Sequence, residues 1–415
     1  MQRSIMVFLL MSILFIFASC SSPNSSRAIL WTDRPEFAFY AEFFNAAQDK
    51  YKVEVRFFEA PAYRLIEGGE YPDIVAASWL KNSSTRVMFR PFDGMLSRGV
   101  LDRSSFYPRL LSMGRIDKRQ YLLPVSFNIP AVIFAKDASI TLSNPFTIEM
   151  REIKEQAKTF NRTSGAVYSR IGFSPSAKDE FLFLAATLFG ASFREASPIA
   201  WDAAALGQSI SWIQQWISEA NTDIQMEEDF VFKHYHNPPD RLISSGRTLY
   251  TYIDSADYFT LPEVRRMNLD FRWIAEKETI PLDERVISYG IHKKTKSRKA
   301  AVEFTRWFFN DETQRLLLEE MKNKRINEVS FGIAGGFSAM QTVTEQIFPQ
   351  FYPDLIGHIP PENYLLPPNV LPRNWMVIKE RVILPYLRER IRHTGTEDIR
   401  PLDRRINDWY RLNRE

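Results

Sequence analysis

The chain has 415 residues, 45% of them hydrophobic, which is long enough for two domains with separate cores. Lys and Arg number 53 against 50 Asp and Glu, and a formal charge of +3 is too balanced to indicate a nucleic-acid partner. The single cysteine, Cys20, excludes an internal disulfide, a cysteine metal site and a cysteine nucleophile in the folded body.

The first twenty residues have the pattern of a cleaved export signal. Arg3 precedes an apolar run, 5–17, that is too short for a comfortable bilayer span, and the polar stretch 21–26 follows as a tether. Phe17-Ala18-Ser19-Cys20 resembles a bacterial lipobox, which would make Cys20 a lipidated mature N-terminus and a membrane anchor. A plain secretory signal with an incidental cysteine is the alternative. No other stretch is long and apolar enough to cross a membrane.

After the tether, strands and a helix alternate. The pattern predicts a strand at 28–31, a helix at 37–47, and strands at 51–58 and 73–77. This order indicates a parallel sheet covered by helices, in which ligand crevices lie beyond the carboxyl ends of the strands. The residues at those ends, which are the first site candidates, are Thr32, Asp33, Arg34, Ser78 and Trp79.

The middle of the chain predicts a second lobe. Two extended pieces flank Ser126-Phe127-Asn128 and Pro130 removes a backbone donor, so we expect the chain to pass from one sheet to another here. The run 181–189 is apolar all round, as in a helix buried in a core, and Leu206 to Ile217 forms a one-sided helical stripe. A strand is expected at 247–253, ending in Asp254-Ser255.

The last third contains a strand that enters a helix, and a basic tail. Val286 to Ile291 predicts a buried strand, and Ala301, Phe304 and Phe308 recur at helical spacing after the cap candidate Ser297. The tail 373–414 carries many Arg residues, but its apolar stripe and interspersed acids favour a packed pair of helices over a nucleic-acid or membrane surface.

The order of these features resembles the family 1 extracellular solute-binding proteins of bacterial ABC importers, whose members bind maltodextrins and other sugars. The likeness covers nearly the whole mature chain. Its motifs are the lipobox-like start, Trp31-Thr32-Asp33, Tyr71-Pro72-Asp73-Ile74-Val75, Leu123-Pro124-Val125-Ser126 leading to Phe134-Ala135-Lys136-Asp137, Ser244-Ser245-Gly246-Arg247-Thr248-Leu249-Tyr250, and Tyr289-Gly290-Ile291.

The resemblance implies an α/β, bilobal periplasmic-binding-protein fold of type II, with the ligand held in a cleft between the lobes. One lobe would hold 27–132 plus 288–346, and the other 133–287 plus 347–415. It also implies a monomeric, extracytoplasmic lipoprotein that delivers a small solute, a carbohydrate by family precedent, to the permease of an ABC importer. No catalytic residue, cofactor or metal is expected.

The resemblance further implies which residues contact the ligand. They are Asp33, Trp79 and Asn128 from the first lobe, Ser174, Ser176, Asp254, Ser255, Tyr258 and Trp375 from the second, and Tyr289 near a lobe crossing. Carboxylate, amide and hydroxyl groups suit sugar hydroxyls, and indole faces suit the apolar face of a sugar ring. The sequence departs from the maltodextrin binders at Asn128, where they have a carboxylate, and at Ala256-Asp257, where they place an aromatic; Tyr258 and Phe259 are the candidate substitutes.

Simpler roles remain open for several of these residues. Trp79 and Trp375 would serve as core residues, and Asp33 as an N-cap for the helix after Pro35. Two other protein classes also remain open. A surface lipoprotein acting as an adhesin or interaction module needs only the same scaffold, and an exported hydrolase needs two carboxylates that are distant in sequence.

The sequence gives only weak evidence for a metal site or for a catalytic nucleophile. His234-Tyr235-His236 is the one close histidine pair, and surface histidines explain it better than a metal site. Gly172-Phe173-Ser174-Pro175-Ser176 lacks the second glycine of a nucleophile elbow, which argues against a serine hydrolase.

Overall fold

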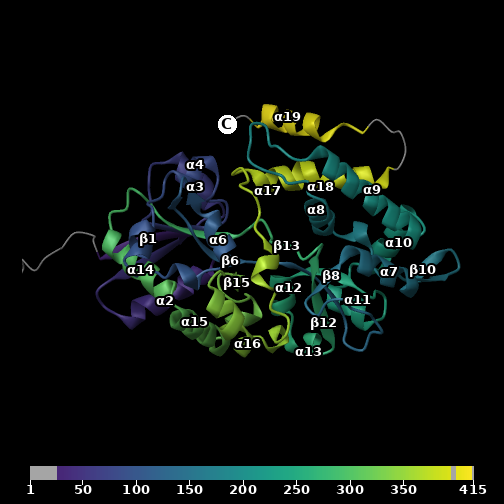
Figure 1. The fold of residues 1–415 in the computed structure, drawn as a ribbon, viewed down its shortest axis with the longest axis horizontal. Helices are drawn as coiled ribbons and strands as arrows, with labels where there is room; N and C mark the ends of the chain where they lie inside the picture. The colour runs from purple at the N-terminus through teal and green to yellow at the C-terminus, as the bar shows by residue number, and fades with distance from the viewer. Residues whose placement is uncertain (1–25, 394–398, 414–415) are drawn as a thin grey trace, which may run out of the picture.

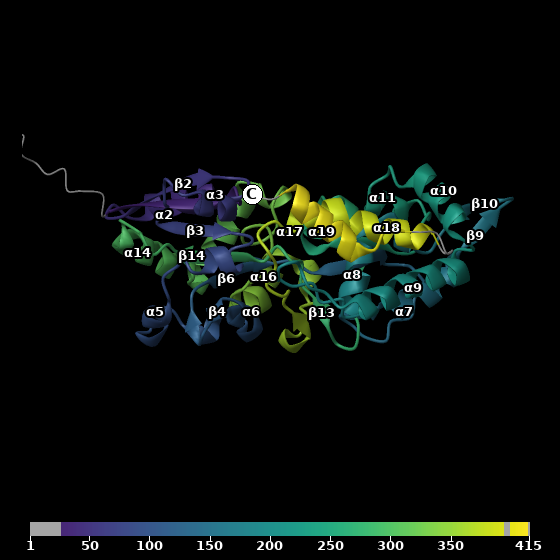
Figure 2. The same ribbon diagram turned by 90° about the horizontal axis from the view of Figure 1, so that it is seen from above.

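The computed structural model describes residues 26–393 and 399–413. Cys20 and the predicted export signal lie outside the described residues. Two α/β lobes lie side by side along the long axis of the molecule (Figures 1 and 2). The bilobal α/β fold expected from the sequence is confirmed. In the described part of the chain, no helix combines the length and apolarity that a bilayer crossing requires.

The sheet of the N-terminal lobe has six strands in the order β15-β6-β14-β3-β1-β2. Their bounds are β1 Arg27–Thr32, β2 Lys52–Phe57, β3 Ile74–Ala77, β6 Leu123–Phe127, β14 Ile287–Ile291 and β15 Phe337–Ser338. β1 pairs in parallel with β2 and β3, as expected, whereas β14 and β15 join antiparallel. The sheet is therefore mixed rather than parallel, because β14 arrives from the other lobe and runs against β3.

Side chains of β1 and β3 alternate between two helix layers. Leu30 and Ala76 face the layer of α2, α14 and α15, whereas Trp31 and Val75 face that of α3. The helices of this lobe are α2 Glu36–Ala47, α3 Pro61–Glu67, α4 Ser83–Arg86, α5 Asp93–Ser97, α6 Pro108–Met113, α14 Arg298–Phe308 and α15 Asp311–Asn323, and a small hairpin is formed by β4 Arg115–Ile116 and β5 Arg119–Gln120. The expected strand and helix after residue 284 are thus β14 and α14.

The C-terminal lobe has a four-stranded sheet in the order β11-β7-β12-β8. Its strands are β7 Pro130–Ala135, β8 Thr147–Glu149, β11 Thr251–Asp254 and β12 Leu269–Ala275. The passage between sheets predicted at Asn128 is confirmed, since β6 and β7 belong to different sheets. The strand expected at 247–253 begins only at Thr251, because the backbone of 247–250 bonds instead to Ile171 and Gly172.

Helices α8, α9 and α18 pack together on one face of this sheet. The helices of the lobe are α7 Met150–Phe160, α8 Asp179–Leu188, α9 Ala203–Ala220, α10 Ile224–His234, α11 Pro239–Ser244, α12 Ser255–Thr260, α13 Glu263–Arg266, α17 Trp375–Ile378, α18 Leu384–Arg392 and α19 Leu402–Leu412, and β9 Arg162–Ser164 with β10 Val167–Arg170 forms a hairpin. The basic tail therefore consists of packed helices, as predicted, with α19 lying along the outside of the lobe (Figure 1).

Three crossing segments connect the lobes: 128–129, 282–286 and the chain between β15 and β16. The third contains α16 Phe348–Phe351, and its strand β16 Leu365–Leu366 pairs with β13 Ile280–Pro281. The Leu282 amide donates to the Leu366 carbonyl at 3.0 Å, and the Asp283 amide donates to the Asn128 carbonyl at 2.9 Å. The crossings are thus tied to one another by backbone hydrogen bonds.

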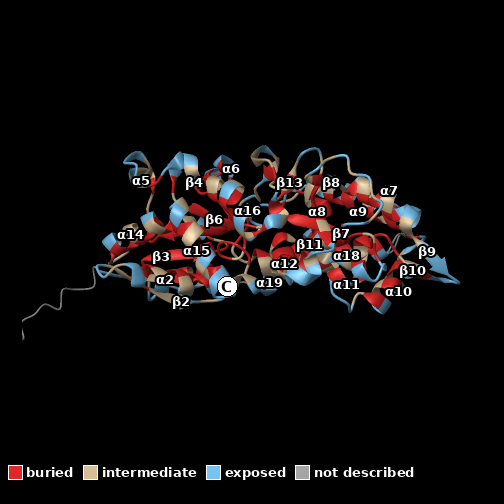
Figure 3. Ribbon diagram, turned by 90° about the horizontal axis from the view of Figure 1, so that it is seen from below, coloured by how far each residue is buried: buried red, intermediate tan, exposed pale blue. Residues whose placement is uncertain are grey.

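A continuous aromatic core joins one face of both sheets. Phe259 of α12 stacks on Phe331 with ring centroids 4.6 Å apart, and Trp273 of β12 meets Phe337 of β15 at 5.8 Å. Buried residues run along the middle of both lobes without a break (Figure 3). Because α16 packs into this shared core, the lobe boundary proposed at 346 stays a prediction.

Candidate ligand-binding cavity

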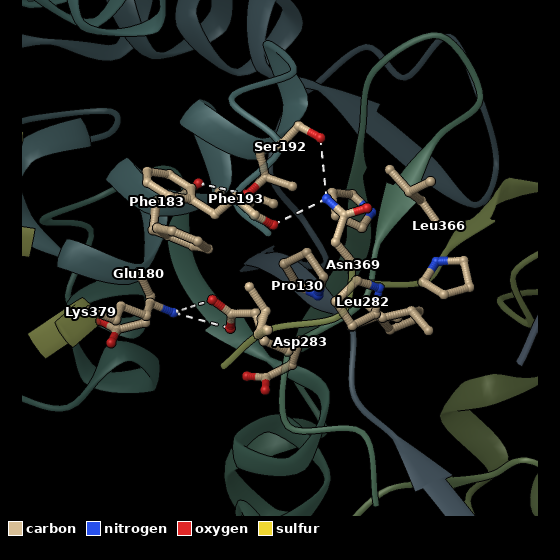
Figure 4. A pocket seen from close by; sticks show the side chains of 18 of the residues that line it. Pro130, Glu180, Phe183, Ser192, Phe193, Leu282, Asp283, Leu366, Asn369 and Lys379 are labelled. Atoms are coloured by element: carbon tan, nitrogen blue, oxygen red, sulfur yellow. Dashed lines mark hydrogen bonds and ion pairs between the residues drawn. The ribbon is translucent and has the colours of Figure 1, made fainter. Parts of the chain in front are cut away.

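A cavity of about 220 Å³ opens where the first two crossings and segment 366–371 meet helix α8. Its lining comes from the first crossing, the second crossing, segment 366–371, one face of α8 with the loop after it, the end of β11, and α17. The lining residues are Ile129, Pro130, Glu180, Phe183, Leu184, Thr187, Gly190, Ser192, Phe193, Tyr252, Asp254, Pro281, Leu282, Asp283, Glu284, Leu366, Pro367, Pro368, Asn369, Leu371, Trp375 and Lys379. Figure 4 shows Glu180 and Lys379 at one wall and Asn369 and Leu366 at the opposite one.

Aromatic rings form the apolar wall of the cavity. Trp375 is fully buried and meets Phe183 at 5.8 Å and Phe193 at 5.5 Å between ring centroids. Its indole Nε1 has no hydrogen-bond partner within the described residues. An unpaired buried N–H is costly, so this donor is a candidate contact for a bound molecule.

The charged wall combines carboxylates with one ammonium. The Lys379 Nζ donates to both Glu284 carboxylate oxygens, at 2.8 and 3.1 Å, and lies 4.1 Å from the Phe183 ring centroid (Figure 4). Asp283 is bound by Arg285 through two side-chain hydrogen bonds of 3.1 and 3.0 Å. Burial opposes ionisation of Asp283, but Arg285 outweighs it and lowers the pKa of that carboxyl.

Asp254 differs from Glu284 and Asp283, each of which is bound by a basic side chain. It ends β11, and its Oδ1 accepts from the Asp257 amide at 2.8 Å as the N-cap of α12. Burial, together with the nearby Asp257 and Asp283 charges, raises the pKa of Asp254 to about 6. Asp254 makes no ion pair in the described part of the chain.

Polar contacts close the rim beside this cavity. Asn369 Nδ2 donates to Ser192 Oγ and to the Phe193 carbonyl, both at 3.1 Å (Figure 4). The carboxylate of Glu195 accepts from the Ser83 amide at 3.0 Å and from Ser83 Oγ at 2.9 Å. Ser83 belongs to the N-terminal lobe and Glu195 to the C-terminal lobe, so this contact bridges the lobes directly.

Trp79 lies at the junction of the lobes, in the wall of a small neighbouring pocket that shares Glu284, Pro368 and Asn369 with the cavity. Its half-buried ring packs against core residues of both lobes. Its φ of 62° is unusual for a bulky residue, and such strain concentrates at functional sites. The next lysine, Lys81, is buried in the same pocket, which lowers the pKa of its ammonium to about 8.

Asp254 and Trp375 are the two predicted contact residues that line the cavity, and Trp375 is both a core and a cavity residue. Asp33 lies at the end of β1, where Oδ2 accepts from the Ser78 amide at 3.1 Å and from the Ser78 hydroxyl. The alternative that Asp33 caps α2 is wrong, because Pro35 occupies that position without a side-chain bond.

Asn128 and Ser255 hold the first crossing together. The Ser255 Oγ donates to Asn128 Oδ1 at 2.7 Å, and Asn128 Nδ2 donates to the Gly335 carbonyl at 2.8 Å. Both side chains are therefore committed to the junction between the lobes, next to the cavity residues Ile129 and Pro130 rather than in its lining.

The remaining predicted contacts lie away from the cavity. Ser176 donates its amide and hydroxyl to the buried Glu227, at 2.9 and 2.6 Å, and Ser174 is buried beside it. Tyr258 packs against Phe271 in the shared aromatic core, and Tyr289 is fully buried with its hydroxyl 2.8 Å from Thr305 Oγ1. Packing and internal hydrogen bonds explain Ser176, Tyr258 and Tyr289.

Sequence reasoning missed most of the cavity lining. Glu180 and Phe183 lie on one face of α8, for which the sequence predicts only a buried apolar run at 181–189, and Lys379 lies in the tail, for which it predicts only packed helices. Two segments could have been identified as site candidates from the sequence, because each places polar residues in a connection next to a strand. They are Leu282-Asp283-Glu284 and Pro367-Pro368-Asn369.

Comparison with known proteins places the fold. The sequence matches no protein-family model and no curated protein. The fold is that of the sugar-binding solute-binding proteins of ABC transporters, which confirms the fold expected from the sequence resemblance.

Three solved structures illustrate the likeness. An ABC substrate-binding protein from Listeria monocytogenes in complex with cycloalternan superposes with a TM-score of 0.64 at 13% identity, covering 94% of this chain and 99% of that one. The cyclic α-maltosyl-1,6-maltose binding protein from Arthrobacter globiformis gives 0.63 at 13%, covering 92% and 97%. The maltose/maltodextrin-binding domain from Bdellovibrio bacteriovorus bound to maltotriose gives 0.55 at 14%, covering 93% and 100%.

Proposed function

We propose that this protein captures a small saccharide in the cavity between its lobes and delivers it to the permease of an ABC importer, without altering it chemically. The observation that carries the proposal is the position of the cavity, which is lined by the first and second crossing segments and by segment 366–371, which directly follows the third. A molecule bound there contacts the parts of the chain that must move when the lobes rotate. Binding can therefore be coupled to lobe closure.

The chemistry of the lining suits a saccharide. Phe183, Phe193 and Trp375 offer aromatic surface for the apolar face of a sugar ring. Asp254 and Glu180 offer carboxylate oxygens, and Asn369 an amide, to hydroxyl groups. The combination of an apolar wall with a few polar groups is typical of small-molecule sites.

Membrane tethering completes the proposal. Lipidation of Cys20 would hold the protein at the outer face of the membrane, where a permease operates, and the tether 21–26 would give it reach. Mass spectrometry of the membrane-extracted protein tests this part: a mature N-terminus at Cys20 carrying acyl chains is expected.

A thermal-shift screen tests ligand capture. The purified protein is melted with mono-, di- and oligosaccharides, polyols and glycerophosphodiesters, and at least one saccharide should raise the melting temperature, because a ligand that binds only the folded state stabilises it. Tryptophan fluorescence should change with the same ligand, since Trp375 lines the cavity. A screen in which no saccharide shifts the melting temperature contradicts the proposal.

Two substitutions at Trp375 separate binding from stability. Trp375→Phe retains a ring in the core and removes the unpaired Nε1 donor, so we expect weaker saccharide binding with a nearly unchanged melting temperature of the free protein. Trp375→Ala should destabilise the free protein by about 3–5 kcal/mol, because it empties a fully buried site.

A further inference from the structure

Building on the proposed function, we propose that the bound saccharide carries a protonated amine, as an amino sugar does, and that Asp254 and Glu180 bind that amine. The charges that line the cavity, and the groups already paired with them, assign the solute to a cationic class and exclude acidic saccharides.

Negative charge exceeds positive charge at the cavity. Four carboxylates line it, those of Glu180, Asp254, Asp283 and Glu284, against the single ammonium of Lys379. Lys379 is engaged by both oxygens of Glu284, and Asp283 is engaged by Arg285 from outside the lining. Within the described ranges, Glu180 and Asp254 are left without an ion-pair partner.

The four carboxylates share the cavity lining with Tyr252. Tyr252 and Asp254 are two residues apart on β11 and so project from the same face of the strand. Glu180, Asp283 and Glu284 line the same cavity as this face of β11. Burial raises the pKa of the Tyr252 phenol, and the charges of the four carboxylates raise it further. A cation beside Tyr252 would meet several of these charges at once.

Trp375 adds a separate requirement, a hydrogen-bond acceptor on the ligand. Its indole is fully buried, lines the cavity, and has an Nε1 donor without a partner in the described residues. The ligand must therefore offer an acceptor as well as a cation. Ring hydroxyls supply acceptors and an ammonium supplies the charge, and an amino sugar carries both on one ring.

A metal ion does not account for the carboxylates. Among the described residues, no group of three or more acidic, histidine or cysteine side chains is arranged to hold a metal. An organic cation needs no such shell, because an ammonium donates along separate directions to well-spaced oxygens.

Asp254 predicts how binding depends on pH. The charged groups that face it are Asp257 on its own helix, Asp283 and Arg285 on the second crossing, and Glu284 with Lys379 beyond them. Burial and the two aspartates raise the pKa of Asp254 to about 6. Binding of an amine that is protonated throughout should therefore weaken as the pH falls through this value.

The test is a titration calorimetry panel on the purified protein. Glucosamine, galactosamine, mannosamine and their β-1,4-linked dimers are compared with the neutral sugars that differ only by a hydroxyl in place of the amine, and with their uronic acids. At about pH 7 we expect at least one amino sugar to bind about tenfold or more tightly than its neutral counterpart, since tenfold corresponds to about 1.4 kcal/mol. That preference should shrink at about pH 5.

Matched variants locate the effect. Asp254→Asn keeps an N-cap acceptor for α12, and Glu180→Gln keeps the side-chain shape, so both should fold. Each should reduce the preference for the amine by about fivefold or more while leaving neutral-sugar binding within about twofold. Asp229→Asn is the control, because this exposed side chain on α10 removes a charge from the same lobe, does not line the cavity and is not among the charges that act on Asp254.

The outcomes distinguish the two proposals. Neutral sugars that bind as tightly as amino sugars, or amine preference that survives in both carboxylate variants, would overturn the inference and leave the proposed function standing. Tight binding of a uronic acid would overturn it as well. A panel in which no sugar of any class binds would overturn the proposed function, and the inference with it.

Discussion

Glu227 is a carboxylate held inside the C-terminal lobe without a cation. It is fully buried and accepts hydrogen bonds from the Ser176 amide and hydroxyl and, at 2.6 Å, from Asn221 Nδ2. Burial raises the pKa of Glu227 to about 7 even though these three donors favour its charged form. The side chain therefore couples folding of this lobe to pH.

The sign of this coupling follows from the direction of the shift. Because the folded pKa lies above the unfolded value, the stabilisation from a neutral Glu227 is fully present below about pH 4.5 and is lost as the pH rises through about 7. We expect the free energy of unfolding to fall by up to about 3 kcal/mol from this group between about pH 5 and pH 8. Urea denaturation at a series of pH values measures the slope.

Glu227→Gln should flatten that slope, whereas the control Asp229→Asn, an exposed residue two positions further along the same helix, should leave it unchanged. A slope that is equally steep in Glu227→Gln would show that another group is responsible.

Glu227 also accounts for the position of one of the two serines that the sequence places at the ligand. Ser174 and Ser176 were assigned to the ligand by their match to a family turn, but Ser176 instead satisfies a buried acid that lies 51 residues further along the chain. Asp254 and Trp375, which are also expected at the ligand, do line the cavity, since Asp254 ends β11 and Trp375 begins α17. Their contact with a ligand stays a prediction. The residue type alone does not show whether a side chain lines the cavity or satisfies a buried group elsewhere.

At the scale of elements, β14 is the strand that joins the two halves of the N-terminal sheet. It lies between β3 and β6 and is buried along its whole length. A β-carbon added at Gly290 would lie 2.4 Å from Phe89 Cδ1 and 2.9 Å from Leu122 Cδ2. The glycine is therefore required by the close approach of two buried side chains and not by its backbone conformation.

Gly290→Ala should destabilise the protein by about 1–3 kcal/mol, because the surrounding core must shift to admit a methyl group. The matched control is Gly207→Ala in the exposed part of α9, where nothing lies within 4 Å of the added atom. That change should stabilise the helix by about 0.5–1 kcal/mol. Opposite signs are expected in chemical denaturation, and equal effects would contradict the packing of β14.

Most elements could be predicted from the sequence because their apolar patterns are local. Strands β1 and β3, helix α9 and the terminal helices follow from periodicity, and Pro130 marked the change of sheet. The antiparallel direction of β14 could not be predicted, since it depends on where the chain re-enters the first lobe. The late start of β11 depends likewise on backbone bonds to Gly172, a tertiary contact.

At the scale of the whole molecule, the two lobes share a packed core on one side. On the side of the cavity they are joined by few polar groups. The aromatic core around Phe259, Phe331 and Phe337 joins one face of both sheets. The rim beside the cavity is closed by polar contacts, chiefly Ser83 with Glu195. Rotation that opens the cavity should therefore separate the rim and pivot about the aromatic core.

Glu195→Ala should shift the free protein toward an open form by removing the carboxylate that bridges the lobes. Spin labels at Ser97→Cys and Ser218→Cys, exposed positions in different lobes, in a Cys20→Ser background report the distance between the lobes by double electron–electron resonance. We expect a longer and broader distance distribution in Glu195→Ala, and a return toward the wild-type distribution when a bound saccharide is added.

The control for this measurement is Asp229→Ala, which removes an exposed carboxylate from the C-terminal lobe far from the rim. Identical distributions in wild type and Glu195→Ala would mean that the bridge does not hold the lobes together.

The cavity itself was the feature least accessible from sequence. Its walls come from segments at 129–130, 180–193, 252–254, 281–284 and 366–379, and no local sequence pattern predicts that these segments meet. Their meeting is set by how the lobes dock, which depends on the aromatic core and the crossings. The family resemblance supplied the expectation of a cleft, and the structure supplied its lining.

The most direct test of this account is a crystal structure of the protein with the saccharide that gives the largest thermal shift. We expect the sugar in the cavity of about 220 Å³, with its ring against Trp375 and a polar group within hydrogen-bond distance of Asp254. A sugar bound elsewhere, with this cavity empty in the complex, would contradict the account.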